Sequence, residues 1–159
     1  MNLDAYAQWI AGLPPAVFLR DSSIGYLLVN AAHIAALGTL LGSIMALDLR
    51  LLRRAGTLPL REFGPYLSRL AAVALAIAIV TGLMLFSVKP DEYLRNPAFL
   101  AKLAVVALGI ANAVWLHAGK NWRRALQEPQ IPPALRMHAA ASLLFWLGAI
   151  VAGRWIGFL

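Results

Sequence analysis

Four long apolar runs, separated by short polar stretches, divide the chain. The first has no charged residue between Ile24 and Leu47, and at about 1.5 Å per helical residue these positions cover roughly 36 Å, enough to cross a hydrocarbon core of about 30 Å. Capping and breaking residues, such as Asn96-Pro97 before the third run, predict spanning helices at about 22–52, 66–88, 97–119 and 134–157. The sequence therefore predicts an all-α fold: one membrane domain, residues 1–159, built as an integral four-helix bundle with antiparallel neighbours.

A short amphipathic segment precedes the first run. Apolar residues recur at helical spacing over residues 2–12, with Trp9 beside them, until Pro14-Pro15 interrupts the pattern. Such a segment is typical of a short helix in the plane of the membrane interface. It lacks the basic start and cleavage site of a signal peptide, so we expect it to be retained. Ser22 or Asp21 is predicted to cap the first spanning helix.

Composition agrees with a membrane location. Hydrophobic residues make up 61% of the 159 positions and charged residues only 13%, with a mean hydropathy of +0.72, which a soluble domain could not hide from water. The net charge of +7 could suggest nucleic acid, but the basic residues cluster between apolar runs, so we expect no nucleic-acid partner. The absence of cysteine excludes disulfides, thiolate-bound iron–sulfur clusters and the covalent attachment of c-type haem.

The distribution of basic residues predicts the topology. Nine lie in the first and third connections and five on the other side, together with Asp4, Asp21, Asp91 and Glu92. The positive-inside rule then places both termini in the periplasm of a bacterium, with the chain in the inner membrane. The nine are Arg50, Arg53, Arg54, Arg61, Arg69, Lys120, Arg123, Arg124 and Arg136, and the five are Arg20, Lys89, Arg95, Lys102 and Arg154.

Histidines carry most of the candidate chemistry. His33 lies near the middle of the first run, where a polar side chain usually has a function, and it shares a helical stripe with Tyr26, Asn30 and Leu37 that we expect to face the bundle interior. His117 and His138 lie near the ends of the third and fourth helices. Imidazoles on facing helices are the usual ligands of non-covalent haem, so His33, His117 and His138 are candidate metal ligands. Depth along the helices favours the pair His117 and His138 over His33 with His117, whose offset is on the order of 8 Å.

Other polar and small residues are secondary candidates. Arg154 is a candidate anchor for a quinone carbonyl, a haem propionate or an anionic headgroup. Asp48 and Arg50 are typical of an interfacial charge pair, and Asp48 could also bridge to Arg69 or Arg136. A seam of small residues predicts close helix packing, or else room for a flat cofactor; it comprises Ala31, Ala35, Gly38, Gly42 and Ala46.

Several short motifs resemble a family of small, mostly uncharacterised bacterial four-helix inner-membrane proteins, similar in layout to the copper-resistance D and cytochrome b561-like groups. They are Asp48-Leu49-Arg50-Leu51-Leu52, Thr81-Gly82, Asn96-Pro97-Ala98-Phe99 with Lys102, Asn112 with His117, Ser142-Leu143 with Trp146, and Ala152-Gly153-Arg154. The resemblance implies that His33 and His117 are the typical histidines, whereas His138 falls where the family has a small apolar residue. It therefore favours His33 with His117 as the haem pair.

Together these observations predict an inner-membrane protein that binds b-type haem and takes part in electron transfer, for example as the membrane subunit of a redox complex. Its cofactor-binding residues would be His33, His117, Asn30 and Arg154. The alternative is a cofactor-free structural protein or a copper or small-solute transporter. No hydrolase, P-loop or dinucleotide motif is present, so no intrinsic catalytic residue is predicted. Expected partners are the lipid bilayer, a quinone or a redox protein, and a second copy of the chain.

Overall fold

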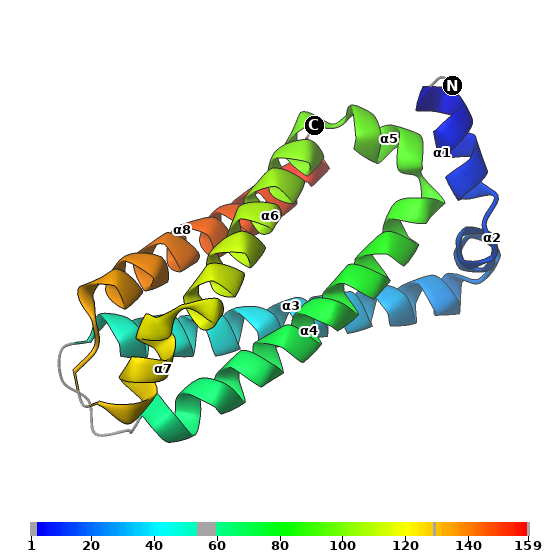
Figure 1. Cartoon of the computed structure of the whole chain (residues 1–159). Helices are drawn as coiled ribbons and strands as arrows, with labels where there is room; N and C mark the ends of the chain where they lie inside the picture. Colours follow the sequence, from blue (N-terminus) through cyan, green and yellow to red (C-terminus); the bar gives the residue numbers. More distant parts are fainter. Residues whose placement is uncertain (1–2, 54–59, 129, 159) are drawn as a thin grey trace.

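The computed structural model describes residues 3–53, 60–128 and 130–158, and these residues form only helices and their connections (Figure 1). Arg54, counted above among the basic residues, lies outside this range. The elements are α1 (Leu3–Ala11), α2 (Pro14–Asp21), α3 (Ser23–Leu52), α4 (Leu60–Val88), α5 (Pro90–Arg95), α6 (Pro97–Ala118), α7 (Lys120–Gln127), α8 (Pro133–Trp155) and the 3₁₀ turn η1 (Ile156–Phe158). The predicted all-α fold is confirmed.

Four of these helices, α3, α4, α6 and α8, are long and apolar enough to cross a membrane. α3 packs most extensively against α4, and α6 against α8, while α3 also contacts α8. α4 and α6 are consecutive spanning helices, but they make few or no close backbone contacts with each other within the described chain. They diverge toward α5 (Figure 1). The bundle is therefore closed on three sides and open on the fourth, and we call the opening between α4 and α6 the lateral window.

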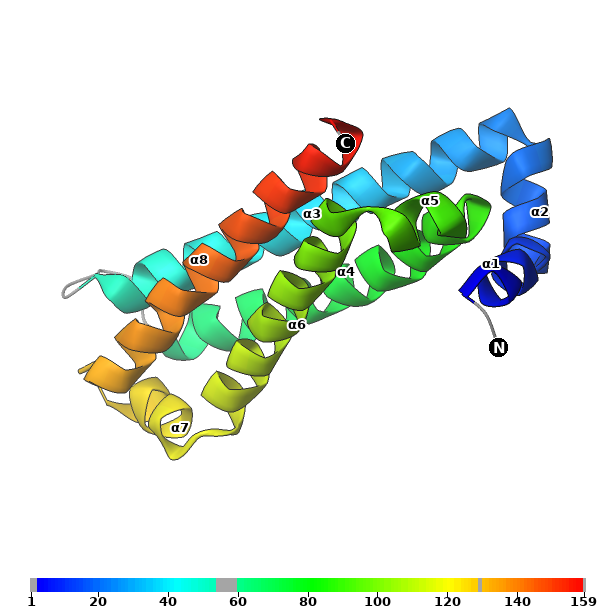
Figure 2. The same cartoon turned by 90° about the horizontal axis from the view of Figure 1, so that it is seen from above.

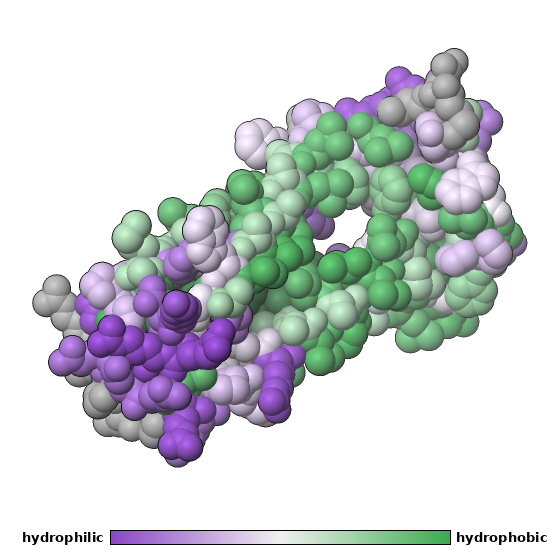
Figure 3. Space-filling model, viewed as in Figure 1, coloured by the Kyte–Doolittle hydropathy of each residue, from purple (hydrophilic) through white to green (hydrophobic). Residues whose placement is uncertain are grey.

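The two ends of the bundle differ. Both chain termini lie at the end that also holds α1, α2 and α5, which we call the α5 end (Figures 1 and 2). At the opposite, α7 end, hydrophilic residues gather on the surface, whereas hydrophobic residues dominate the middle of the bundle (Figure 3). This division into an apolar middle and a polar end is what a multi-pass membrane protein requires.

Some helix boundaries differ from those expected. α4 begins at Leu60 and contains Pro65 in its second turn, so the helix starts before the expected position 66. Two prolines expected to end a pattern begin short helices instead: Pro14 starts α2 and Pro90 starts α5, since proline suits the first helical position. Neither these two short helices nor α7 was predicted.

The predicted caps are confirmed. The Ser22 hydroxyl accepts from the Gly25 backbone N–H (3.0 Å) at the start of α3. The Asn96 side chain accepts from the N–H groups of Ala98 and Phe99 (2.9 and 3.2 Å) at the start of α6. Each cap satisfies backbone donors that the first helical turn leaves free.

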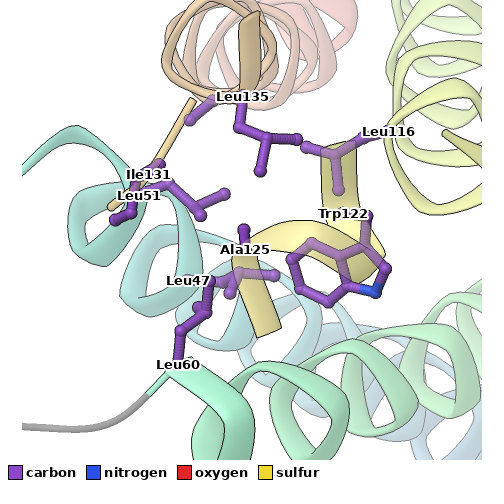
Figure 4. Close-up of a cluster of buried hydrophobic side chains, with 9 residues drawn as sticks. Leu47, Leu51, Leu60, Leu116, Trp122, Ala125, Ile131 and Leu135 are labelled. Carbon is purple, nitrogen blue, oxygen red and sulfur yellow. The ribbon is translucent and has the colours of Figure 1, made fainter. Parts of the chain in front are cut away.

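The main hydrophobic core lies at the α7 end (Figure 4). Side chains from α3, α4, α6, α7 and α8 meet there, and Leu51 and Leu135 are the largest that are completely buried. Trp122 of α7 lies between α4 and α6 and fills the space that would otherwise separate them (Figure 4). The cluster comprises Leu47, Leu51, Leu60, Leu116, Trp122, Ala125, Ile131, Leu135 and Ala139.

Aromatic rings bridge α4 and α6 at the α5 end. Phe86 of α4 stacks on Phe99 of α6 with ring centroids 5.5 Å apart, and Tyr93 of α5 packs against both rings. Burial raises the pKa of the Tyr93 phenol, as expected for a ring covered by its neighbours. The lateral window is thus closed by Trp122 at one end and by this aromatic stack at the other. Figure 3 shows the opening between them, bordered by hydrophobic residues.

Candidate functional site

A cavity of about 390 Å³ lies among the four spanning helices, between the core at the α7 end and the middle of the bundle. Its wall is mostly apolar and includes residues of α4 and α6, the two helices that border the lateral window. A largely apolar cavity with a few polar groups is the usual form of a small-molecule site. The polar and aromatic residues on its wall are Ser43 and Asp48 of α3, Ser68 and Arg69 of α4, Asn112 and His117 of α6, and Ser142 and Trp146 of α8.

Asp48 is the charged side chain buried most deeply in this wall. It is only 3% exposed, and the Ser142 hydroxyl of α8 faces its carboxyl group. Its Oδ2 atom has no hydrogen-bond partner, and none of the ion pairs found among the described residues includes it. The ion pairs found among the described residues therefore do not include the interfacial pair predicted for Asp48, whose side chain is buried within the bundle.

Trp146 contributes a second polar atom without a partner. Its indole is 6% exposed, and Nε1 donates to no group in the described chain. Gly109 of α6 gives the ring its place, because a Cβ at that position would lie 3.1 Å from the indole Cε2. Most buried donors and acceptors in proteins are satisfied, so two such atoms on one cavity wall indicate a missing partner.

His117 forms a hydrogen-bonded pair with Ser68 at the α7 side of the cavity. Its Nδ1 donates to the Ala113 carbonyl (2.7 Å), because a carbonyl only accepts, and its Nε2 lies 2.8 Å from the Ser68 hydroxyl. That hydroxyl is also 2.8 Å from the Gly64 carbonyl, and its one proton can serve only one of the two acceptors. The Trp122 ring packs against the imidazole with centroids 4.6 Å apart. Ser68 and His117 therefore join α4 to α6 here.

His138 locks α8 to α6 through Asn112. The Asn112 amide donates to the His138 carbonyl (3.0 Å), and its Oδ1 accepts from the imidazole Nδ1 (2.7 Å). The Trp115 ring lies beside the imidazole, 6.0 Å between centroids. This reciprocal pair gives His138 a structural task.

His33 lies on the α3–α4 contact. The Thr81 hydroxyl donates to the Ile77 carbonyl (2.7 Å), so it accepts from His33 Nδ1 (2.9 Å). A neutral ring then keeps its lone pair on Nε2. Gly82 provides space for the ring, since a Cβ there would lie 3.1 Å from Cε1. The ammonium of Lys102, on α6, is near enough to act on the imidazole electrostatically.

The structure does not bring His33 and His117 together. Their partners Thr81 and Ser68 are 13 positions apart on α4, which corresponds to about 20 Å along the helix. Two axial imidazoles of one haem must lie on opposite sides of a single iron, only a few ångströms apart. In this arrangement the pair does not fit one haem.

The remaining candidates lie on the surface of the chain. Asn30, Tyr26 and Leu37 are exposed, so the stripe predicted around His33 does not face the interior as a whole. Arg154 is exposed at the α5 end, with its guanidinium 4.7 Å from the centre of the Phe158 ring. Every residue of the small-residue seam is exposed, and a Cβ at Gly38 or Gly42 would meet nothing within 4 Å. The seam therefore makes no close helix packing within the chain.

No group of three or more metal-binding side chains occurs in the part of the chain that the structure describes. Comparison with protein families shows that residues 22–159 match a family of unknown function (DUF6644). No curated protein and no solved structure matches the chain. The likeness to the copper-resistance D and cytochrome b561 groups stays a prediction.

Sequence reasoning gave too little weight to Asp48 and Trp146. Asp48 precedes Arg50, which favours a surface pair. However, Ile44 and Leu51, four positions before it and three after it, are apolar and lie on the same helix face. A lone acid on the apolar side of a helix end was the available signal. No sequence pattern indicates that the Trp146 indole Nε1 lacks a partner, because its hydrogen bonding depends on contacts between helices.

Proposed function

Since the chain belongs to a family of unknown function, we propose from its geometry that it is a membrane protein that binds a lipid-soluble quinone or quinol in the cavity. The observation that supports this function is the presence of a free acceptor, Asp48 Oδ2, and a free donor, Trp146 Nε1, on one mostly apolar wall. A hydroxyl or carbonyl head on an apolar molecule satisfies both without exposing its body to polar groups.

The lateral window provides the entry. Because α4 and α6 make few or no close contacts, a molecule dissolved in the bilayer can reach the cavity without crossing either surface of the membrane. The rim of this opening is hydrophobic (Figure 3), so an apolar tail can stay among lipid chains while the head enters. A fully water-soluble solute would gain nothing from such a rim.

The polar groups are placed for a head that both donates and accepts. A quinol hydroxyl can donate to Asp48 Oδ2, and a quinone or quinol oxygen can accept from Trp146 Nε1. Ser142, beside Asp48, and Trp146 are four positions apart on α8, so the two contacts lie about one helical turn apart. That separation suits the oxygens of one small ring system.

We also propose the topology and setting that the charges favour. Basic residues at the α7 end place this end in the cytoplasm and both termini in the periplasm, in a bacterial inner membrane. The cavity then lies in the cytoplasmic half of the bilayer. A redox protein docked at the α7 end would act on a quinone held there, which makes the chain a membrane subunit in electron transfer.

The test is equilibrium binding of decylubiquinone to the full chain in detergent, with quenching of tryptophan fluorescence as the measure of binding. We expect a saturable component with the native chain. Ala113→Leu fills the cavity and should remove that component, whereas Ala111→Leu, two positions away on the exposed face of the same helix, should leave it. Equal saturable quenching in both variants, or none in the native chain, would contradict the proposal.

Haem is a second candidate, favoured by the lone pair on His33 Nε2. Metal-bound histidines usually donate their other ring N–H to a fixed acceptor, as His33 does to Thr81. Since His117 does not fit as its partner, His33 would hold a b-type haem alone, and such a group would supply one-electron transfer. An absorbance spectrum of the purified protein decides: a Soret band lost in His33→Ala and kept in His117→Ala supports haem. Bound copper without that band supports copper transport instead. If the protein shows neither a Soret band nor bound copper, both the haem and the copper candidates are contradicted.

A further inference from the structure

The seven acidic residues of the chain fall into two unequal groups. Six are exposed: Asp4, Asp21, Glu62, Asp91, Glu92 and Glu128. Asp48 alone is buried, at 3% exposure, and it lies one turn inside the end of a membrane-spanning helix. Any property that depends on a carboxyl group in an apolar environment therefore belongs to this residue.

The surroundings of Asp48 disfavour a negative charge. Its neighbours along α3, Leu47 and Leu51, belong to the hydrophobic core, and the side chain facing its carboxyl group is the neutral hydroxyl of Ser142. The charged or titratable side chains that share the cavity wall are Arg69 on α4 and His117 on α6. Arg69 is exposed, and His117 already uses both ring nitrogens within the protein. An ionised carboxylate without an ion pair in such a place is strongly destabilised, and a carboxylic acid is not.

We propose that Asp48 is the proton-carrying group of the cavity: its carboxyl is protonated while the cavity is empty, and the ligand-bound acid donates its O–H to a carbonyl oxygen. The second half rests on the proposed quinone site, whereas the first half stands without it. The unpaired Oδ2 then has a specific use, since a neutral acid can donate to a quinone carbonyl and accept from a quinol hydroxyl.

A lipid-soluble carbodiimide tests the first half. Dicyclohexylcarbodiimide reacts with protonated carboxyl groups in apolar sites: the acid O–H adds across one C=N bond, a C–O and an N–H bond form, and no atom leaves. We expect intact-mass and peptide analysis of the full chain to show one adduct, on Asp48, before any of the six exposed acids. A water-soluble carbodiimide should give the reverse order. Labelling of Asp48 no faster than that of the exposed acids would overturn the proposal.

Two substitutions test the second half. Asp48→Asn keeps the shape and an N–H donor, so it mimics the neutral acid, and we expect its affinity for decylubiquinone to stay within about threefold of the native value. Asp48→Leu removes the donor, and its affinity should fall at least about tenfold because a buried carbonyl loses its partner. An equal loss in both variants would show that the ionised carboxylate binds the ligand. This result would overturn the proposal.

The two failures can be told apart. If the native chain binds no decylubiquinone but Asp48 is still labelled first, the quinone function fails and the proton site stands. If the quinone binds saturably and the labelling shows no preference for Asp48, the proton site fails alone. Added decylubiquinone should also slow the labelling of Asp48 if both proposals hold.

Discussion

The two ends of the bundle are closed in different ways. At the α7 end, large side chains from five helices meet in one core, with Leu51 and Leu135 fully buried (Figure 4). At the α5 end, the helices are joined by an aromatic stack, by the close approach of His33 to Gly82, and by contacts of α1 with α5 and of α2 with α4. Lipid chains are as apolar as leucine, so burial alone does not hold helices together in a membrane. Dense packing and specific polar contacts must do so, and here they alternate along the bundle.

The difference explains where a ligand can enter. Between the two closures, α4 and α6 make few or no close backbone contacts, and Ser68 with His117 at the α7 side is the hydrogen bond found between them in the described chain. Their described side chains meet there through a small cluster around Leu40 of α3 and Trp146 of α8. The cavity lies on the α7 side of this open stretch. A densely packed α7 end and a bridged α5 end thus enclose an open middle.

The largest expected effect comes from the core at the α7 end. Leu135→Ala removes a completely buried side chain of α8 and leaves a cavity in the core. The side chains around it come from five helices that already pack against one another, so they cannot move to fill the cavity. We expect the free energy of unfolding to fall by about 2–5 kcal/mol. Thermal unfolding of the purified full chain in detergent measures it.

Leu83→Ala is the matched control on the open half. Leu83 of α4 is 62% exposed, so its side chain faces the detergent or lipid, and we expect its loss to change stability by less than about 0.5 kcal/mol. Similar losses in the two variants would show that the α7 end is not the main core.

A smaller effect is expected at the α3–α4 contact near the α5 end. Gly82→Ala places a methyl group 3.1 Å from His33 Cε1 and pushes the imidazole away from Thr81. We expect a loss of about 1–3 kcal/mol, as for other overpacked sites. Gly38→Ala, whose new methyl would meet nothing within 4 Å on α3, should be neutral or stabilising by up to about 1 kcal/mol. Unfolding in detergent compares the two variants, and equal effects would mean that Gly82 has no role in seating His33.

Hydropathy and cap signals predicted the four spanning helices well. Charge-free runs of bilayer length and the caps Ser22 and Asn96 depend only on local sequence, and the structure has them at nearly the expected positions. The short helices α2, α5 and α7 were not predicted, because a proline or a basic stretch that ends one helical pattern can equally well begin another.

The site was less predictable because it depends on rotation and offset of helices. A stripe of residues on one helix face is visible in the sequence, but which face meets a neighbour is not. His33 does contact α4, whereas Asn30 on the same stripe is exposed. The distance between His33 and His117 follows from which residues of α4 each one meets, and no spacing within α3 or α6 contains that information.

The smallest expected effect tests the surface contacts of the α5 end. Arg95 of α5 donates to Asp4 of α1 at 2.6 Å, and both side chains are more than half exposed. Water screens such a pair and ordering two long side chains opposes it, so a double-mutant cycle with Asp4→Asn and Arg95→Gln should give a coupling of about 0–1 kcal/mol. Added salt should reduce it further. Ala7 of α1, which is 1% exposed, then supplies most of the attachment through packing. A coupling well above 1 kcal/mol that survives high salt would instead mean that the lipid interface covers the pair, and that the α5 end is held by charge as firmly as the α7 end is by its core.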